Sequence, residues 1–365
     1  MRVLQVAKRS VTLLAAVSVV LTGCGDTGPD VPFNPAGTSA DMEAVDAAFG
    51  SSTFASFSSL SVLFDAAYTG APLVSSSAVA MDIRGRGAAG MRAAAMRSAQ
   101  RLAGLLPAAA NKSFSASSAA IPAGIAGKTY EYSGGTYVPT DRTGAPANGV
   151  RFLLYAVDPV TFTPVEPLVE TGYVDVTDLS GTNTRSARVE VVSGNTTYLD
   201  YTVTVTATAT VGQVTVIGFV TDGTTRANIN LRSTITQIAG LTLFYALDVP
   251  QRDFSINLRM TATGLDQQSG TIDIDLGLSG PNGSISMRGQ FSETGGTLTV
   301  RVNGNPFATL TSSGAGVPVI TGADGQPLSD EDAEALRGIF EMTGEAFTSF
   351  DEMVVPVGAF LEPAA

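Results

Sequence analysis

Apolar and polar residues alternate along the middle of this chain with the period of a β-strand. In residues 199–211 the alternate positions from Leu199 onward are apolar, while Asp200 and five threonines occupy the positions between them. Successive side chains of a strand point to opposite faces, so the segment predicts a strand with one dry and one wet face. The same alternation recurs in 187–191, 227–231, 241–247, 254–260, 272–278, 285–287 and 298–302.

Turn residues separate these segments. They stand at 194–195, 222–223, 280–283, 295–296 and 303–304, as Gly, Asn, Asp and Pro. Short turns of this kind connect antiparallel neighbours. Two further strands at 150–158 and 172–178, joined by a proline-bearing loop, bring the prediction to about ten to twelve strands in a meander. A twisted sheet of that width tends to curl.

Helical periodicity flanks the alternating region on both sides. Residues 91, 95, 99, 102 and 106 are apolar and share one helical face, which predicts an amphipathic helix over 88–106. Apolar residues at 42, 45 and 49 and at 60, 63 and 64 indicate one or two earlier helices. Leu336, Ile339, Phe340, Phe347 and Phe350 predict a helix over 330–352, and Ser329 with Asp332 matches a capping box at its start.

These periods predict an α+β domain over residues 41–365. Its parts are a helical, Ala/Ser/Arg-rich segment at 41–127, an antiparallel β-sheet at 128–323, and a C-terminal helix and tail at 324–365. A sheet with one apolar face must cover that face, and the flanking helices are what the chain offers. We therefore expect a large curled antiparallel meander packed with N-terminal helices and a C-terminal helix.

The N-terminal residues have the pattern of an export signal, and this pattern ends in the only cysteine of the chain. Arg2, Lys8 and Arg9 form a basic region, residues 11–21 are apolar and uncharged, and Leu21-Thr22-Gly23-Cys24 follows. This arrangement resembles the leader of bacterial lipoprotein precursors. The resemblance covers about 24 residues and implies a signal peptide at 1–23, a lipobox cysteine that receives fatty acyl chains such as palmitate, and a membrane anchor. Residues 24–40, rich in proline and glycine, are then the lipidated residue and its tether.

An ordinary secretory leader in which Cys24 is incidental is the alternative to a lipobox. In the enteric sorting rule of lipoproteins, aspartate directly after the cysteine retains the protein on the inner membrane. Gly25 takes that place here and Asp26 comes second. The resemblance therefore implies a cell-envelope protein on the outer membrane rather than the inner membrane.

Composition narrows the chemistry that we expect. The net charge is −12, and removal of Arg2, Lys8 and Arg9 with the leader leaves 18 basic and 33 acidic residues, which disfavours nucleic acid as a partner. The chain has no histidine, and histidine is the commonest metal ligand and the usual catalytic base near neutral pH. We expect no enzymatic activity, no catalytic residues, no metal site and no cofactor.

Three local motifs have simple structural explanations. Gly85–Gly90 matches the dinucleotide pattern G-x-G-x-x-G, but no acidic residue lies between Asp82 and Glu131, so we assign it to a flexible loop before a helix. Asp273 and Asp275 share the wet face of a strand, where solvated carboxylates are favoured over a glycosidase pair. The acidic run at 330–334 lacks the spacing of an EF-hand and is assigned to helix capping.

Charge is spread unevenly along the chain. Residues 83–128 contain seven basic residues and no acidic residue, whereas 324–362 contain ten acidic residues and one basic residue, Arg337. The arginine-bearing helix could lie beside the C-terminal helix, or it could contact anionic lipid headgroups near the anchor. Two independently solvated faces explain the pattern equally well, because exposed ion pairs contribute only about 0–1 kcal/mol.

Two functions fit these features. The first is a carrier in which the sheet and helices enclose an apolar small molecule such as a lipid, in a hollow lined by residues such as Phe254, Leu258, Ile274 and Leu298. It resembles lipoprotein-carrier and lipid-shuttling architectures in fold alone. The second is a structural or adhesive surface lipoprotein whose threonine-rich face contacts envelope components. In both, the membrane is a partner through the lipid anchor.

The lipobox yields the first testable prediction. Metabolic labelling with a radioactive fatty acid should mark the wild-type protein, because the Cys24 thiol accepts the diacylglyceryl group. The variant Cys24→Ser should stay unlabelled at equal expression. An unlabelled wild-type protein would overturn the anchor and leave the ordinary secretory leader.

Overall fold

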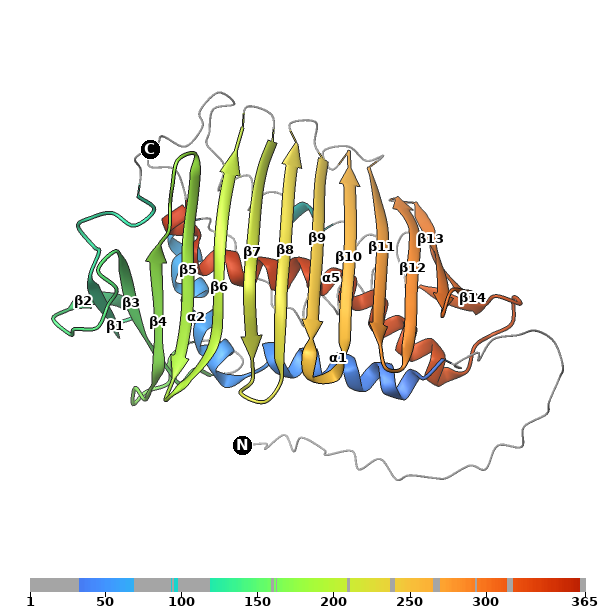
Figure 1. The fold of residues 1–365 in the computed structure, drawn as a ribbon, viewed down its shortest axis with the longest axis horizontal. Coiled ribbons are helices and arrows are strands. Elements are labelled where there is room, and N and C mark those ends of the chain that lie inside the picture. Colours follow the sequence, from blue (N-terminus) through green and yellow to red (C-terminus); the bar gives the residue numbers. More distant parts are fainter. Residues whose placement is uncertain are drawn as a thin grey trace, which may run out of the picture. The chain divides into compact units, whose positions relative to one another are not determined.

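The computed structural model describes residues 33–68, 93, 95–97, 119–158, 161, 163–208, 211–236, 240–264, 270–292, 294–313 and 318–361. All of them belong to one unit, Val31–Ala365. A single open sheet of fifteen strands runs through this unit, and the long helices α1 (Pro35–Phe49), α2 (Ser52–Tyr68) and α5 (Asp330–Leu361) lie against one of its faces (Figure 1).

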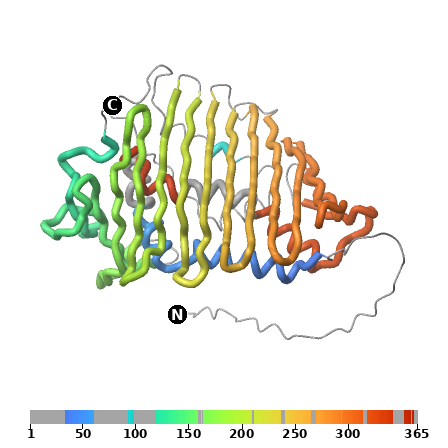
Figure 2. Tube along the Cα trace, in the orientation of Figure 1, coloured from blue at the N-terminus to red at the C-terminus, as the bar shows by residue number. Residues whose placement is uncertain are grey.

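The strands follow one another in the sheet nearly in chain order, as the colour sequence of Figure 2 shows. The order is β15-β14-β13-β12-β11-β10-β9-β8-β7-β6-β5-β4-β3-β1-β2, and every neighbouring pair is antiparallel except β1 and β3. The bounds are β1 (Lys128–Ser133), β2 (Thr136–Thr140), β3 (Gly149–Tyr155), β4 (Glu170–Asp178), β5 (Thr184–Ser193), β6 (Thr196–Ala207), β7 (Val211–Thr221), β8 (Arg226–Thr236), β9 (Gly240–Val249), β10 (Phe254–Thr263), β11 (Thr271–Gly280), β12 (Gly283–Ser292), β13 (Gly295–Val302), β14 (Asn305–Ser312) and β15 (Val319–Gly322).

The alternation predicted from the sequence separates the two faces of the sheet. In β6, Leu199, Tyr201, Val203 and Val205 are buried, and the residues between them are only half-buried. The buried side chains of β3–β14 join those of α1, α2 and α5 in one hydrophobic cluster. We call the surface that packs on the helices the inner face and the opposite surface the free face. None of the described helices covers the free face (Figure 1).

Helix α1 runs across the ends of the strands and is fixed there by polar contacts. Asn34 caps its N-terminus by accepting a hydrogen bond from the Gly37 amide, and Pro35 suits the first helical position. The Asp41 carboxylate, whose side chain is 4% exposed, accepts hydrogen bonds from Arg252 Nε at 2.8 Å and Asn282 Nδ2 at 3.1 Å. A buried carboxylate needs such partners, so these bonds tie α1 to the turns below β9–β12.

Two glycines in the sheet make room for large aromatic side chains on the neighbouring strand. Gly218 of β7 lies opposite Tyr201 of β6, whose ring packs edge-on against Phe57 of α2 and whose hydroxyl donates to the Met353 carbonyl of α5 at 2.9 Å. Burial raises the pKa of Tyr201, which keeps this hydroxyl a donor. Gly296 lies opposite Phe291 in the same way, and the Phe291 ring contacts Phe340 of α5. These two sites fix α2 and α5 on the inner face.

Both edges of the open sheet are poor templates for a further strand. The outermost strand at one edge, β2, has five residues and contains Pro139, which has no N–H to donate. At the other edge, β15 has four residues and follows Pro318. Short strands and prolines are the devices that prevent edge-to-edge pairing.

The structure confirms a large antiparallel sheet with helices before and after it in the sequence. It differs from the prediction in several details. The sheet has fifteen strands where ten to twelve are predicted. Helix α1 begins at Pro35, within the predicted tether 24–40, and α5 continues to Leu361, nine residues beyond the predicted end at Glu352. Pro356 removes one helical hydrogen bond, and burial of Val354, Val357 and Leu361 compensates for that loss.

The role of Gly218 in making room for Tyr201 can be tested by comparison with Gly277, a strand glycine that has no close neighbour. A Cβ atom at Gly218 would lie 2.1 Å from the Asp200 carbonyl oxygen and 2.4 Å from Tyr201 Cα, so Gly218→Ala should lower the free energy of unfolding by about 1–3 kcal/mol. At Gly277 of β11, on the free face, the nearest atom is 4.0 Å away, so Gly277→Ala should be neutral or stabilising by up to about 1 kcal/mol. Urea unfolding measures both values, and equal effects of the two substitutions would contradict this role of Gly218.

Candidate functional site

The free face is mainly polar across the central strands, and its outward side chains are half-buried or exposed. Its outward residues are mainly threonine, serine, asparagine, aspartate and arginine, and they stand in rows that cross the strands in register. One row runs through Thr215, Arg232, Phe244, Arg259 and Asp275, from β7 to β11. A face of this composition can offer hydrogen bonds and charge to a partner, since its polar groups do not contribute to the core.

Arginine–aspartate pairs occupy the parts of the free face on either side of its centre. Arg188 of β5 donates to Asp200 of β6 with both Nε and Nη2, each at 2.8 Å. This bidentate contact raises the pKa of Arg188. Arg288 Nε of β12 donates to Asp275 Oδ1 of β11, also at 2.8 Å. These pairs neutralise charge locally and hold neighbouring strands in register.

The centre of the free face is different, because its arginines have no carboxylate partner among the described residues. Arg226 lies over the Phe219 ring at 3.7 Å from the centroid and donates from Nε to Asn228 at 2.9 Å. Arg232 lies 5.9 Å from the centroid of Phe244. Arg226, Arg232 and Arg259 are all exposed. The sequence pattern does not predict this group, since the three residues come together only through strand register.

The predicted carboxylate pair is on the free face, as expected for solvated residues. Asp273 and Asp275 are both exposed. Asp273 accepts a hydrogen bond from Gln290 at 3.0 Å, and Asp275 accepts one from Arg288. A glycosidase acid must be partly desolvated to raise its pKa, so neither carboxylate has the environment of a catalytic acid.

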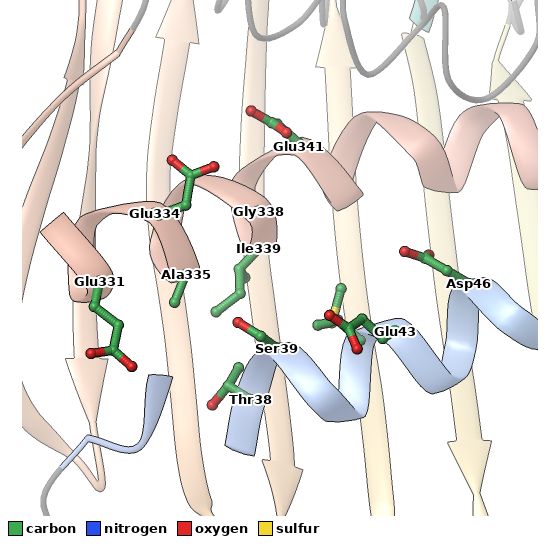
Figure 3. Close-up of a pocket in the computed structure, with 11 residues that line it drawn as sticks. Thr38, Ser39, Glu43, Asp46, Glu331, Glu334, Ala335, Gly338, Ile339 and Glu341 are labelled. Carbon is green, nitrogen blue, oxygen red and sulfur yellow. The ribbon is translucent and has the colours of Figure 1, made fainter. Parts of the chain in front are cut away.

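A concave site on the helix side of the sheet is an acidic groove between α1 and α5, with a volume of about 420 Å³ (Figure 3). Met42, Ala335 and Ile339 contribute apolar atoms. Carboxylates from both helices surround them, as Figure 3 shows; they belong to Glu43, Asp46, Glu331, Glu334 and Glu341. Within the described part of the chain, no set of three acidic, histidine or cysteine residues is placed to hold a metal ion.

The acidic run at the start of α5 caps the helix, as its sequence predicts. The Asp332 amide donates to Ser329 Oγ at 3.1 Å, and Ser329 Oγ donates to the Asp332 carboxylate at 2.7 Å. Asp330 and Glu331 lie in the first turn, where negative charge is favourable. Glu334 forms an ion pair with Arg337 one turn later.

The four side chains expected to line a hollow are packed in the core. Phe254, Leu258, Ile274 and Leu298 are 0–3% exposed and belong to the single hydrophobic cluster that includes the helices. A side chain that lines an open cavity would keep accessible surface toward it. The packing of these residues is that of a filled interior.

Several predicted features lie outside the described residues. These are Cys24 with its leader and the glycine motif at 85–90. Of the predicted helix 88–106, only Ala93 and residues 95–97 are described; they are helical, and Ala95 is buried in the core cluster. The placement of the remaining arginines of that segment, Arg92 and Arg101, stays a prediction.

Comparisons of the chain with protein-family models, with curated proteins and with solved structures gave no match. Among the described helices, none is long and apolar enough to cross a membrane. The leader and the two faces of the sheet are therefore the features that bear on function.

The acidic groove yields a prediction about pH. Burial of the Asp46 carboxylate raises its pKa from the ordinary value of 3.8, although part of the residue is exposed, and the charge of Glu43 adds to the effect. The folded protein thus binds this proton more tightly than the unfolded chain, and the contribution to stability falls as pH rises through the folded-state pKa. Asp46→Asn removes that dependence.

Urea unfolding of wild type and Asp46→Asn at about pH 4 and about pH 7 tests this difference. The variant should gain stability relative to wild type at the higher pH. Ser39→Ala, a non-ionisable change in the same groove, should leave the pH dependence unchanged. A constant difference between Asp46→Asn and wild type at the two pH values would contradict the raised pKa.

Proposed function

We propose that this chain is a lipid-anchored cell-envelope protein that uses its free sheet face as a binding surface for an envelope component. The observation that carries the proposal is the division of the sheet. The described helices pack on the inner face, while the outward side chains of the opposite face are mainly polar and half-buried or exposed. A broad face whose polar side chains are left to solvent is suited to contact with a large partner.

The leader supports the location that we propose. Leu21-Thr22-Gly23-Cys24 resembles a lipobox, and Gly25 favours the outer membrane. From Cys24 to Phe33 the chain has nine residue steps, which span at most about 30 Å. Phe33 packs on Phe307 of β14 with ring centroids 5.1 Å apart, so the tether joins the domain near one end of the sheet. Attachment at one end leaves the free face available for binding.

The core packing favours a binding surface over an apolar carrier. A carrier needs a hollow of several hundred Å³ beneath the helices. Phe254, Leu258, Ile274 and Leu298 fill that region with packed side chains. We propose no catalytic activity, because the chain has no histidine and the aspartates of the free face are solvated.

A steric block on the free face tests the proposal. Ala246 of β9 lies between Asn230 and Asn257 on the neighbouring strands, so Ala246→Trp places an indole ring at the centre of the face. The mature chain, residues 24–365 with Cys24→Ser, should co-sediment with purified cell-wall and outer-membrane fragments, and Ala246→Trp should weaken this binding at least about tenfold, because a hot-spot contact contributes about 2 kcal/mol.

Ser39→Trp in α1 is the matched control, since it adds the same side chain to the helix layer. Its binding should equal that of the parent protein. Equal binding by both tryptophan variants, or no binding by the parent, would overturn the proposed function. Native mass spectrometry of the same protein tests the alternative, because a lipid that co-purifies in a fixed ratio would favour the carrier.

A further inference from the structure

The charges of the free face differ from those of the rest of the chain. The chain has 33 acidic and 21 basic residues. The outward positions of β5–β13, in contrast, hold six arginines (Arg188, Arg226, Arg232, Arg259, Arg288, Arg301) and five carboxylates (Glu190, Asp200, Asp248, Asp273, Asp275). The excess of acid therefore lies elsewhere, with part of it on α1 and α5.

The positive charge of this face is concentrated on the central strands β7–β10. Their outward positions carry Arg226, Arg232 and Arg259 against a single carboxylate, Asp248, which accepts a hydrogen bond from Asn228 at 3.3 Å. Arg259 stands opposite Asp275 in register, but that carboxylate is bonded to Arg288. We call Arg226, Arg232 and Arg259 the arginine strip.

The arginine strip has the dimensions of an extended ligand rather than of a small ion. Arg232 and Arg259 flank Phe244 in one row, and strands lie about 4.8 Å apart, so their Cα atoms are separated by about 10 Å. Arg226 is six residues from Arg232 on β8, which is about 20 Å along the strand. Three cations at these separations suit a polymer that carries negatively charged groups at intervals along its length.

The row between these arginines can accept and donate hydrogen bonds. It consists of Ile217, Asn230, Ala246 and Asn257, one residue from each of four adjacent strands. The Asn257 side chain is exposed and carries both an amide donor and a carbonyl acceptor. Ile217 is 54% exposed, which gives the row an apolar contact surface. An exposed amide in one row with an apolar side chain suits a ligand with hydroxyl groups and C–H faces.

We propose that the arginine strip binds a carboxylated polysaccharide, and this inference rests on the proposed function of the free face. Guanidinium groups pair with carboxylates through two parallel hydrogen bonds, and stacking of Arg226 on Phe219 presents its edge to such a ligand. Sugar hydroxyls can exchange hydrogen bonds with the exposed Asn257 amide in the row between the arginines. Charge, spacing and hydrogen bonding therefore point to one class of ligand.

Other polyanions fit the face less well. A phosphate backbone would meet three arginines on a protein of net charge −12, which is too few for strong counterion release. An anionic bilayer would find only two large exposed apolar side chains, Val211 and Ile217, on the described outward positions of β7–β10. Stable interfacial binding needs an apolar face that enters the headgroup region.

The test uses the mature chain, residues 24–365 with Cys24→Ser, and polygalacturonate as the probe. Titration calorimetry should show binding to polygalacturonate and none to neutral dextran. Arg232→Gln should weaken the affinity about tenfold, which corresponds to about 1.4 kcal/mol, because it removes a charged hydrogen-bond donor. Arg301→Gln removes one positive charge from the same face outside the strip, where Arg301 donates to the Gly304 carbonyl at 2.9 Å, and should change the affinity less than about twofold.

Asn230→Asp is a second variant that keeps every arginine and adds a carboxylate to the strip. It should also weaken polygalacturonate binding. Equal losses for Arg232→Gln and Arg301→Gln, or equal or tighter binding to phosphatidylglycerol vesicles or duplex DNA, would overturn the inference. If envelope fragments bind the parent protein but polygalacturonate does not, this inference fails while the proposed function stands. If neither binds, both fail.

Discussion

Burial of one face of a very wide sheet is the constraint on which the rest of this structure depends. Every second residue of the central strands is apolar, and that set cannot be left in water at about 25 cal/mol for each Å² exposed. Helices from the two ends of the sequence therefore return to the same surface. Tyr201 shows how closely they are fitted, because one side chain contacts a strand glycine, an α2 ring and an α5 carbonyl.

That constraint also divides the polar chemistry of the molecule. The helix layer carries clustered carboxylates, and the groove between α1 and α5 desolvates Asp46. The free face carries arginines, hydroxyls and amides, with paired charges at the sides and unpaired arginines at the centre. Among the described residues, a one-sided core thus separates a carboxylate-rich helix groove from an arginine-bearing sheet face.

Periodicity in the sequence was enough to predict the sheet, the antiparallel connections and the C-terminal helix, because each depends on local patterns. It missed β7 as a separate strand, since Ile217 and Phe219 place apolar residues on the wet face and Thr208 closes the preceding turn without glycine. The short strands β1, β2 and β15 carry too few alternating positions for a prediction, and β14, which begins with the turn-type residues Asn305 and Pro306, is missed as well. Phe33 and Asn34 anchor α1 through residues 248 or more positions away in the sequence, so its early start could not be seen locally.

The candidate site was less accessible to sequence reasoning than the fold. Arg232 and Arg259 are neighbours only because both pair with Phe244 of the strand between them, and a shift of one residue would move each to the inner face. The carboxylates Asp273 and Asp275 could be placed on the wet face by alternation alone. Only the register of the central strands shows that none of the described carboxylates is bonded to the arginine strip.

The short edge strands β2 and β15 disfavour pairing between copies of the protein, which matters where many copies share one membrane surface, as we propose. With Pro139 at one side and a four-residue strand at the other, many copies can accumulate side by side without seeding fibrils from their exposed backbones. Under the surface location and binding role that we propose, many copies in one layer would hold a polymeric partner by avidity rather than by the affinity of one copy.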